Sequence, residues 1–445
     1  MDNPIIINRK SFYNSWVALV VFIFLIIFQP DKMTFYAIRP ADIWLIFCLI
    51  LQVLTVENII IRFRKRFIVK NYGFLIGVLA IVATIVQASY ANLTVSDSFI
   101  FQFYRFLRFL LIFKFAENIT GNLKVNNFHK FWKIFTIIGL FVIVLSWLEF
   151  YSVSPYKELI MDLYFFNPDM IEAYLINVER LAGVMGNANA TAILLVCTLP
   201  YSLLQIANED RNLLTKTIHI FYFFAVVYVL AVMTASRTAI FISVLIPMII
   251  FIASLRRLKD IVVFISIILF LTILGVSLYN HFESKIVVQE RIINAVQGEE
   301  DFTLSAKGLG KWANRYELWN ERFSTFRNEG NQLAILIGLG YTKAYKDYAD
   351  NGLISTFINT GTIGLILKLI LFFIFIKYGF LRAIKNYRRF RIDSGCLAFA
   401  LVAFGLLLWE FTADLTEHFK LGQLFYLFLS IALIINGKLL YKNSQ

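Results

Sequence analysis

Runs of apolar residues recur along this chain, and they restrict its fold more than any other feature. Each run has about twenty residues, enough for a helix to cross a hydrocarbon core of roughly 30 Å. Charged residues make up 16% of the sequence, whereas soluble domains carry roughly 25%. We therefore expect an all-α polytopic membrane protein that folds as one integral membrane domain.

Basic residues in the loops predict how these runs are oriented. About twelve spans are expected, and clusters of Lys and Arg follow the second, eighth and tenth of them. Because such loops stay in the cytoplasm, alternation places both termini inside and the polar loops 151–186 and 280–351 outside. The expected spans are 14–29, 42–61, 72–91, 98–116, 131–150, 187–206, 217–235, 238–255, 260–279, 352–376, 395–413 and 421–440.

The charge and the cysteines argue against two further classes of protein. The net charge of +13 is carried mainly by short loops beside the spans, so membrane orientation explains it better than a nucleic-acid partner does. All three cysteines, Cys48, Cys197 and Cys396, lie in apolar runs, which argues against disulfides and metal sites. We expect no metal, no cofactor and no nucleic acid.

The outer segment 280–351 is the largest polar part of the chain, and we expect the chemistry there. It contains Arg291 and Arg315. Its aromatic residues recur at steps of three and four, which predicts an amphipathic helix that packs on the membrane frame or lies on the bilayer surface. These residues are Trp312, Tyr316, Trp319, Phe323 and Phe326.

Three sites place charged residues where lipid alone would penalise them. Arg105 and Arg108 lie inside the fourth span and share a helix face with Gln102. An arginine within the membrane usually faces a cavity or a partner; the alternatives are a structural ion pair or a side chain that extends to the interface. The second site is the short hairpin Ser236-Arg237, which could equally be an ordinary interfacial turn.

The third site is the point where loop 151–186 returns to the membrane. It reads Glu179-Arg180-Leu-Ala-Gly183 and continues to Asn187 and Asn189. Gly and Asn suit a tight turn, so turn formation alone is an alternative to a binding role.

The outer arginines together indicate an anionic ligand at the membrane surface. Guanidinium groups bind phosphates through two hydrogen bonds at once. A lipid diphosphate fits best, because the bilayer holds its tail while its head reaches the outer loops. The residues concerned are Arg180, Arg237, Arg291 and Arg315, together with Arg105 and Arg108.

At residues 175–370 the chain resembles the family of O-antigen ligases and of O-antigen or capsular polysaccharide polymerases. The matching pieces, in order, are Arg180-Leu-Ala-Gly183 with Asn187-Ala-Asn189, Thr234-Ala-Ser236-Arg237-Thr, Arg315 ahead of Trp319, Gly338-Leu-Gly340, Asp350-Asn351-Gly-Leu and Gly361-Thr-Ile-Gly364-Leu. The resemblance implies a C-type glycosyltransferase architecture in the bacterial inner membrane. It also implies metal-independent work on undecaprenyl-diphosphate-linked glycans of lipopolysaccharide or capsule.

The resemblance also implies roles for single residues. Arg237 is similar to the family's arginine at the short hairpin, and Arg315 to the arginine of its large loop. The ligases carry His-Asn where this chain has Asp350-Asn351, which favours a polymerase. Asp350 is our candidate general base, with an N-cap for the next helix as the alternative; Glu179 is a second candidate base.

The predicted reaction is inverting extension of a lipid-linked glycan. The sugar hydroxyl of a new repeat unit would attack the anomeric carbon of the growing chain and release undecaprenyl diphosphate. Arg237 and Arg315 would stabilise the leaving group, while Arg180, Arg291, Asn187, Asn189 and Asn351 would bind glycan or diphosphate. Expected partners are a chain-length regulator and a flippase. A ligase that transfers glycan to lipid A core or protein, and a transporter of an anionic substrate, are the alternatives.

Overall fold

The computed structural model has a helical fold in the part of the chain that it describes. That part comprises residues 15–28, 39–55, 72–96, 99–122, 125–151, 159, 181, 183–185, 188–208, 211–234, 236–254, 319–320, 322–324, 326–328, 331–342, 351–390, 394–411 and 419–442. Within these ranges, Val95 and Thr342 form an isolated antiparallel bridge.

Helices lie over each predicted span except 260–279, which falls outside the described residues. Four helical stretches, Phe128–Phe150, Ala188–Ala207, Leu213–Thr234 and Gly352–Tyr387, are long and apolar enough to cross a membrane. The fold is therefore consistent with an all-α membrane protein, and the number and sidedness of the spans stay predictions.

The elements are α1 (Ser15–Phe28), α2 (Pro40–Thr55), α4 (Tyr72–Tyr90), α5 (Phe99–Asn122), α6 (Val125–Phe150), α9 (Ala188–Ala207), α10 (Leu213–Tyr228), η1 (Val229–Thr234), α11 (Arg237–Ser254), α15 (Gln332–Ile337), α16 (Gly352–Ile374), η2 (Phe375–Leu381), α17 (Arg382–Phe390), α18 (Ser394–Glu410) and α19 (Phe419–Lys442).

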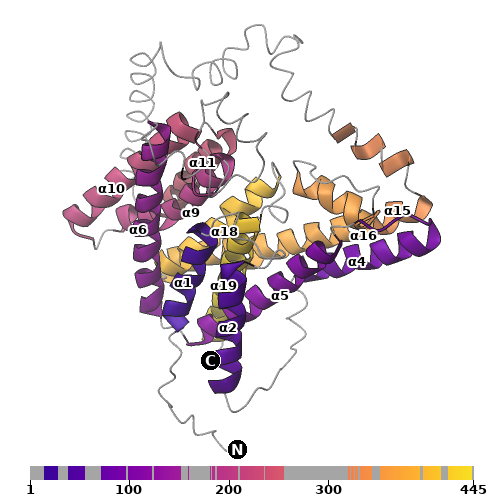
Figure 1. The fold of residues 1–445 in the computed structure, drawn as a ribbon. Helices are drawn as coiled ribbons and strands as arrows, with labels where there is room; N and C mark the ends of the chain where they lie inside the picture. Colours follow the sequence, from indigo (N-terminus) through magenta and orange to yellow (C-terminus); the bar gives the residue numbers. More distant parts are fainter. Residues whose placement is uncertain are drawn as a thin grey trace, which may run out of the picture.

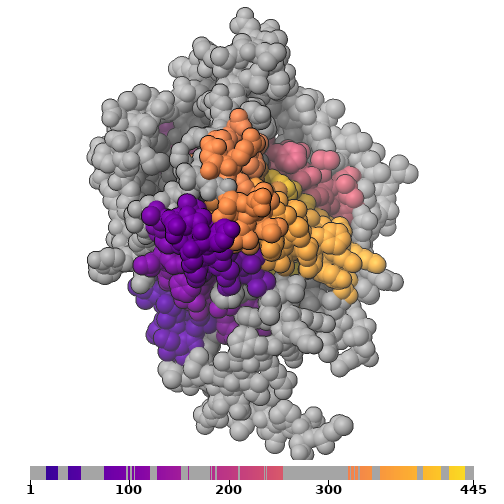
Figure 2. Space-filling view, turned by 90° about the vertical axis from the view of Figure 1, so that its right-hand side faces the viewer, coloured from indigo at the N-terminus to yellow at the C-terminus, as the bar shows by residue number. Residues whose placement is uncertain are grey.

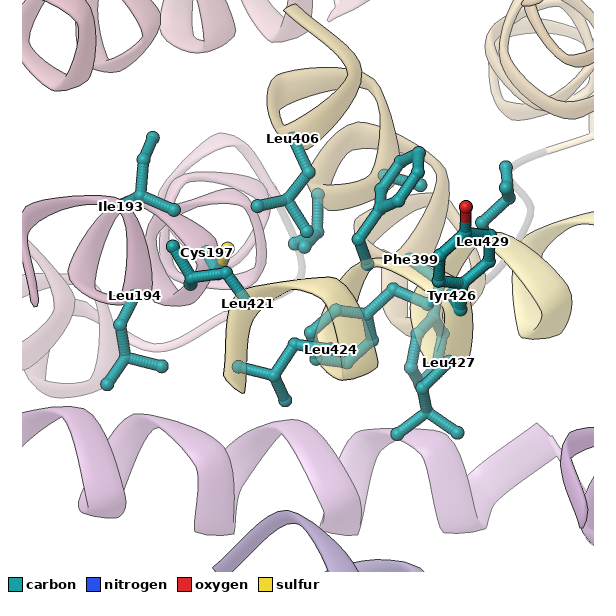
Figure 3. Close-up of a cluster of buried hydrophobic side chains, with 14 of the residues drawn as sticks. Ile193, Leu194, Cys197, Phe399, Leu406, Leu421, Leu424, Tyr426, Leu427 and Leu429 are labelled. Atoms are coloured by element: carbon teal, nitrogen blue, oxygen red, sulfur yellow. The ribbon is translucent and has the colours of Figure 1, made fainter. Parts of the chain in front are cut away.

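The centre of the molecule is formed by α9, α18 and α19 (Figure 1). These helices are apolar on nearly every face, which is the pattern of a helix enclosed by other helices. Leucine, isoleucine and aromatic side chains from all three meet there (Figure 3). Helix α6 adds Trp132, whose ring lies 4.7 Å from that of Phe399 and whose indole nitrogen donates to Gly395 O at 2.8 Å.

Helix α16 reverses direction at Gly361, so the expected span 352–376 is not one straight helix. Gly361 has φ 62° and ψ −161°, outside the helical region. In a straight helix Gly352 and Lys368 would lie about 24 Å apart, yet Lys368 Nζ is 2.7 Å from Gly352 O. Figure 1 shows the two limbs of α16 side by side. The reversal returns Lys368 to the level at which the helix begins.

The end of the outer segment packs on this reversed helix, as the aromatic pattern predicts. The described residues between 319 and 328 are helical. The rings of Phe323 and Phe326 lie 6.1 Å and 5.1 Å from that of Phe357 in the first limb of α16. Helix α15 follows, and together with α4 and α16 it forms one face of the molecule (Figure 2). Trp312 and Tyr316 of the predicted stripe lie outside the described residues.

Candidate functional site

The predicted turn at residues 181–185 lies against the end of η1, just ahead of α11. We call it the Gly183 turn. Leu181 N donates to Met233 O at 3.2 Å, and Arg237 begins α11 four residues after Met233. A π-helical turn such as η1 is uncommon and is frequent at functional sites. Two pieces that the sequence analysis singled out, far apart in the chain, are thus adjacent in space.

Two buried charges of opposite sign hold the Gly183 turn. Gly183 N donates to a carboxylate oxygen of Glu149 at 2.9 Å. Lys420 Nζ donates to Val184 O at 2.9 Å. Glu149 is 2% exposed and Lys420 is 1% exposed, so both hydrogen bonds are shielded from water. Gly183 has φ +66°, a backbone conformation that glycine adopts without strain.

A second turn, residues 351–353, begins α16 at the end of α18. We call it the Gly352 turn. The amide oxygen of Asn351 accepts from Leu353 N at 2.9 Å and Ile354 N at 3.2 Å, which is how an N-cap satisfies the first free N–H groups of a helix. The amide nitrogen of Asn351 donates to Phe411 O at 2.9 Å. The cap of α16 is therefore Asn351, where the sequence analysis had offered Asp350.

A buried ion pair between Lys368 and Glu410 lies directly behind the Gly352 turn. The side chains of both residues are 1% exposed. The ammonium also donates to Gly352 O at 2.7 Å and to Thr356 Oγ1 at 2.8 Å. Glu410 lies so close to Gly352 that a Cβ there would overlap its carboxylate. The lysine of the second limb, the acid of α18 and the start of α16 thus form one cluster.

Gly338-Leu-Gly340 fills the break in α16. Leu339 N donates to Ile358 O at 2.8 Å, and Gly340 N donates to Asn359 O at 3.1 Å. The reversal at Gly361 removes the usual helical partners of these two carbonyls, and the incoming loop replaces them. A side chain at Gly338 would overlap the Asn359 backbone. Two of the pieces that carry the family resemblance therefore fit together.

Helix α4 secures this loop with two polar side chains. Thr84 Oγ1 accepts from Tyr341 N at 2.7 Å. Gln87 Nε2 donates to Gly338 O at 3.0 Å. Both side chains are fully buried, so the residues that follow α15 are hydrogen-bonded to α4.

Arg108 is paired within the protein. Its Nε lies 2.7 Å from an oxygen of Asp42, its guanidinium carbon lies 4.7 Å from the centre of the Tyr104 ring, and its side chain is 4% exposed. This is the structural ion pair that the sequence analysis weighed as an alternative. The binding role predicted for Arg108 stays a prediction.

The remaining predicted residues are only partly placed. Asn189 lies half-buried in the first turn of α9. Arg105 and Arg237 lie in the helical backbones of α5 and α11, and their side chains are outside the described part of the structure. The other predicted site residues also lie outside it: Arg180, Asn187, Arg291, Arg315 and Asp350, as well as Glu179.

Four buried charges that were not predicted from the sequence hold the two turns: Glu149, Lys368, Glu410 and Lys420. A signal for them was present. Glu149, Lys368 and Glu410 are charged residues within otherwise apolar predicted spans, and such residues mark sites with partners. Lys420 directly precedes the last predicted span. The sequence pattern could not indicate that one acid and one lysine would lie together at each turn.

The two turns lie at one end of the helix bundle, which we call the bundle mouth. Helices α6 and α18 end there at Phe150 and Glu410, and α9 and α19 begin there. Within the described ranges, no cluster of three His, Cys, Asp or Glu side chains is placed to hold a metal ion. The sequence itself matches no family model and no curated protein.

Proposed function

We propose that this protein is a membrane glycosyltransferase that polymerises oligosaccharide repeat units carried on undecaprenyl diphosphate. One observation supports the proposal above the others. Parts of three pieces that carry the family resemblance, at Gly183, Ser236-Arg237 and Asn351-Gly352, lie at the same end of the helix bundle, the bundle mouth. An all-α membrane frame with buried charges at one end suits a substrate whose tail is in lipid and whose head is in water.

The proposed chemistry is one inverting displacement. The hydroxyl oxygen of the acceptor sugar attacks the anomeric carbon of the donor glycan, and the bond from that carbon to the diphosphate oxygen breaks. Undecaprenyl diphosphate leaves with the bonding electrons. Arg237 and Arg315 stabilise its charge, and Asp350 accepts the hydroxyl proton. Arg180, Arg291, Asn187 and Asn189 belong to the binding set, and no metal or cofactor takes part.

A gel of surface polysaccharide from cells that lack the protein tests this function. We expect a single repeat unit on its acceptor, with no ladder of longer products above it. Loss of every unit from the acceptor, with long glycan retained on undecaprenyl diphosphate, would identify a ligase. An unchanged ladder contradicts both and favours a transporter of an anionic substrate.

Arginine variants test the mechanism in the same cells. Loss of one preorganised electrostatic group costs about 10²–10³-fold in rate, so Arg237→Ala and Arg315→Ala should each abolish the ladder while the protein still inserts. Arg211→Ala is the matched control, because Arg211 lies between the end of α9 and the start of α10, at the opposite end of the bundle. A normal ladder in either test variant refutes the role of that arginine.

A further inference from the structure

The ammonium group of Lys368, behind the Gly352 turn, has an acceptor for each of its hydrogens. An ammonium group has three hydrogens to donate. Those of Lys368 have three acceptors: Glu410, Gly352 O at 2.7 Å and Thr356 Oγ1 at 2.8 Å. The orientation of the side chain is therefore determined from three directions.

The same cluster determines where α16 begins. Gly352 is in contact with the Glu410 carboxylate on one side and accepts from Lys368 on another. The preceding residue, Asn351, donates to Phe411 O, the carbonyl that follows Glu410 in the chain. Asn351 is thus hydrogen-bonded directly to the end of α18, and Gly352 is linked to it through Lys368.

Stability alone does not account for this arrangement. Replacement of a buried ion pair by apolar residues of similar volume is often neutral or stabilising. A pair of this kind is better explained by the geometry that it imposes. Here that geometry concerns the backbone at residues 351–353, which belong to a piece, Asp350-Asn351-Gly-Leu, that resembles the ligase and polymerase family.

We propose that Lys368 and Glu410 are positioning residues for glycan transfer, because together they hold the Gly352 turn in register with the end of α18. The inference rests on the proposed function, and it adds two residues that act through the backbone of the turn. A displacement of about 1 Å at a reacting geometry can cost about 10²-fold in rate. Loss of the pair should therefore lower kcat and leave KM and folding nearly unchanged.

The test uses a double variant that removes both charges together. Lys368→Met with Glu410→Leu leaves no unpaired buried ion, so the protein should fold. Wild type and variant are purified in lipid nanodiscs and supplied with lipid-linked repeat units extracted from the strain that lacks the protein. We expect kcat to fall about 10²-fold, with KM changed by less than about threefold and an unchanged melting temperature. The control is Lys114→Met with Glu117→Leu, which removes an exposed Lys–Glu pair of 2.8 Å in α5.

Each result decides the inference. A folded double variant with wild-type kcat overturns it, because the pair is then only structural. If the double variant does not fold, Lys368→Arg and Glu410→Asp replace it. Both single variants keep the charge but change the length of the side chain, so we expect a lower kcat in each. An unchanged kcat in both refutes the inference. A wild-type protein that extends no glycan overturns the proposed function and the inference with it.

Discussion

The Gly183 turn and the Gly352 turn solve the same structural problem with the same pair of residue types. Each brings polar backbone into a largely apolar bundle. The first is held by Glu149 and Lys420, the second by Glu410 and Lys368.

The two turns differ in what each charge is bonded to. At the Gly352 turn the acid and the lysine bind one another, and the lysine adds a hydrogen bond to Gly352 O. At the Gly183 turn each charge binds a backbone group directly, Gly183 N or Val184 O. The charges at the Gly352 turn can therefore be removed as a pair, whereas removal of those at the Gly183 turn takes away the described partners of two backbone groups.

The largest expected effect is that of Lys368→Met alone. The substitution leaves the Glu410 charge buried without its lysine, and breaking a buried pair in this way costs about 3–5 kcal/mol. The free energy of unfolding in mixed micelles measures the loss. Lys114→Met is the control, because its partner Glu117 in α5 has a 47% exposed side chain, so the remaining charge is not enclosed by protein and a smaller loss is expected. Equal losses in the two variants would contradict the importance of burial here.

The next effect compares two glycines with positive φ. Gly183 has φ +66° and Gly338 has φ +82°; Gly338 also has ψ −176°, a region essentially restricted to glycine, so alanine at either position should cost about 1–3 kcal/mol and more at Gly338. At Gly183 the new Cβ would meet the side chain of Thr191; at Gly338 it would meet the backbone of Asn359, which gives way less readily than a side chain. Overpacking adds about 1–3 kcal/mol to Gly338→Ala.

The melting temperatures of the two purified alanine variants check this difference. Gly338→Ala should melt at a lower temperature than Gly183→Ala. If Gly183→Ala proves the more damaging, the Gly183 turn is the tighter of the two, and the packing of Gly338-Leu-Gly340 into the break of α16 is less important than the contacts indicate.

A smaller effect is expected from Glu149→Gln at the Gly183 turn. Glutamine keeps an oxygen that can accept from Gly183 N but removes the charge. Hydrogen bonds to charged groups contribute about 1.5–3 kcal/mol and neutral ones about 0.5–1.5 kcal/mol, so the loss should be about 1 kcal/mol. Denaturation in mixed micelles again provides the measurement, with Glu117→Gln as the exposed control. A loss as large as that of Lys368→Met would mean that the carboxylate has a charged partner of comparable importance.

The apolar runs made most of the helix positions predictable, but they could not indicate the reversal of α16. A run from 352 to 376 has the same hydropathy whether the helix is straight or turns back at Gly361. The pieces Gly338-Leu-Gly340 and Gly361-Thr-Ile-Gly364 were visible in the sequence. Their contact is not, because it depends on hydrogen bonds between backbone groups some twenty residues apart.

The candidate site was predictable only in part. A turn was expected at Gly183, and residues 183–185 form one. Asn351 rather than Asp350 caps α16, a choice that the sequence cannot make because both residue types are good caps. Lys368 was overlooked because, in a straight span, it would lie far from the helix start; only the reversal makes it a partner of Gly352.

The smallest expected change in stability is that of Lys368→Met combined with Glu410→Leu. Gly352 O keeps the hydrogen bond from Thr356 Oγ1, at 2.6 Å, so removal of both charges leaves no buried ion and no backbone oxygen without a donor. The free energy of unfolding should stay within about 1 kcal/mol of wild type, since such replacements are often neutral. The equivalent change at the Gly183 turn, Glu149→Leu with Lys420→Met, removes the described partners of Gly183 N and Val184 O and should cost about 1–3 kcal/mol for each. Equal losses in the free energy of unfolding would contradict this comparison. They would show that a turn depends equally on its charges whether these bind each other or bind backbone groups.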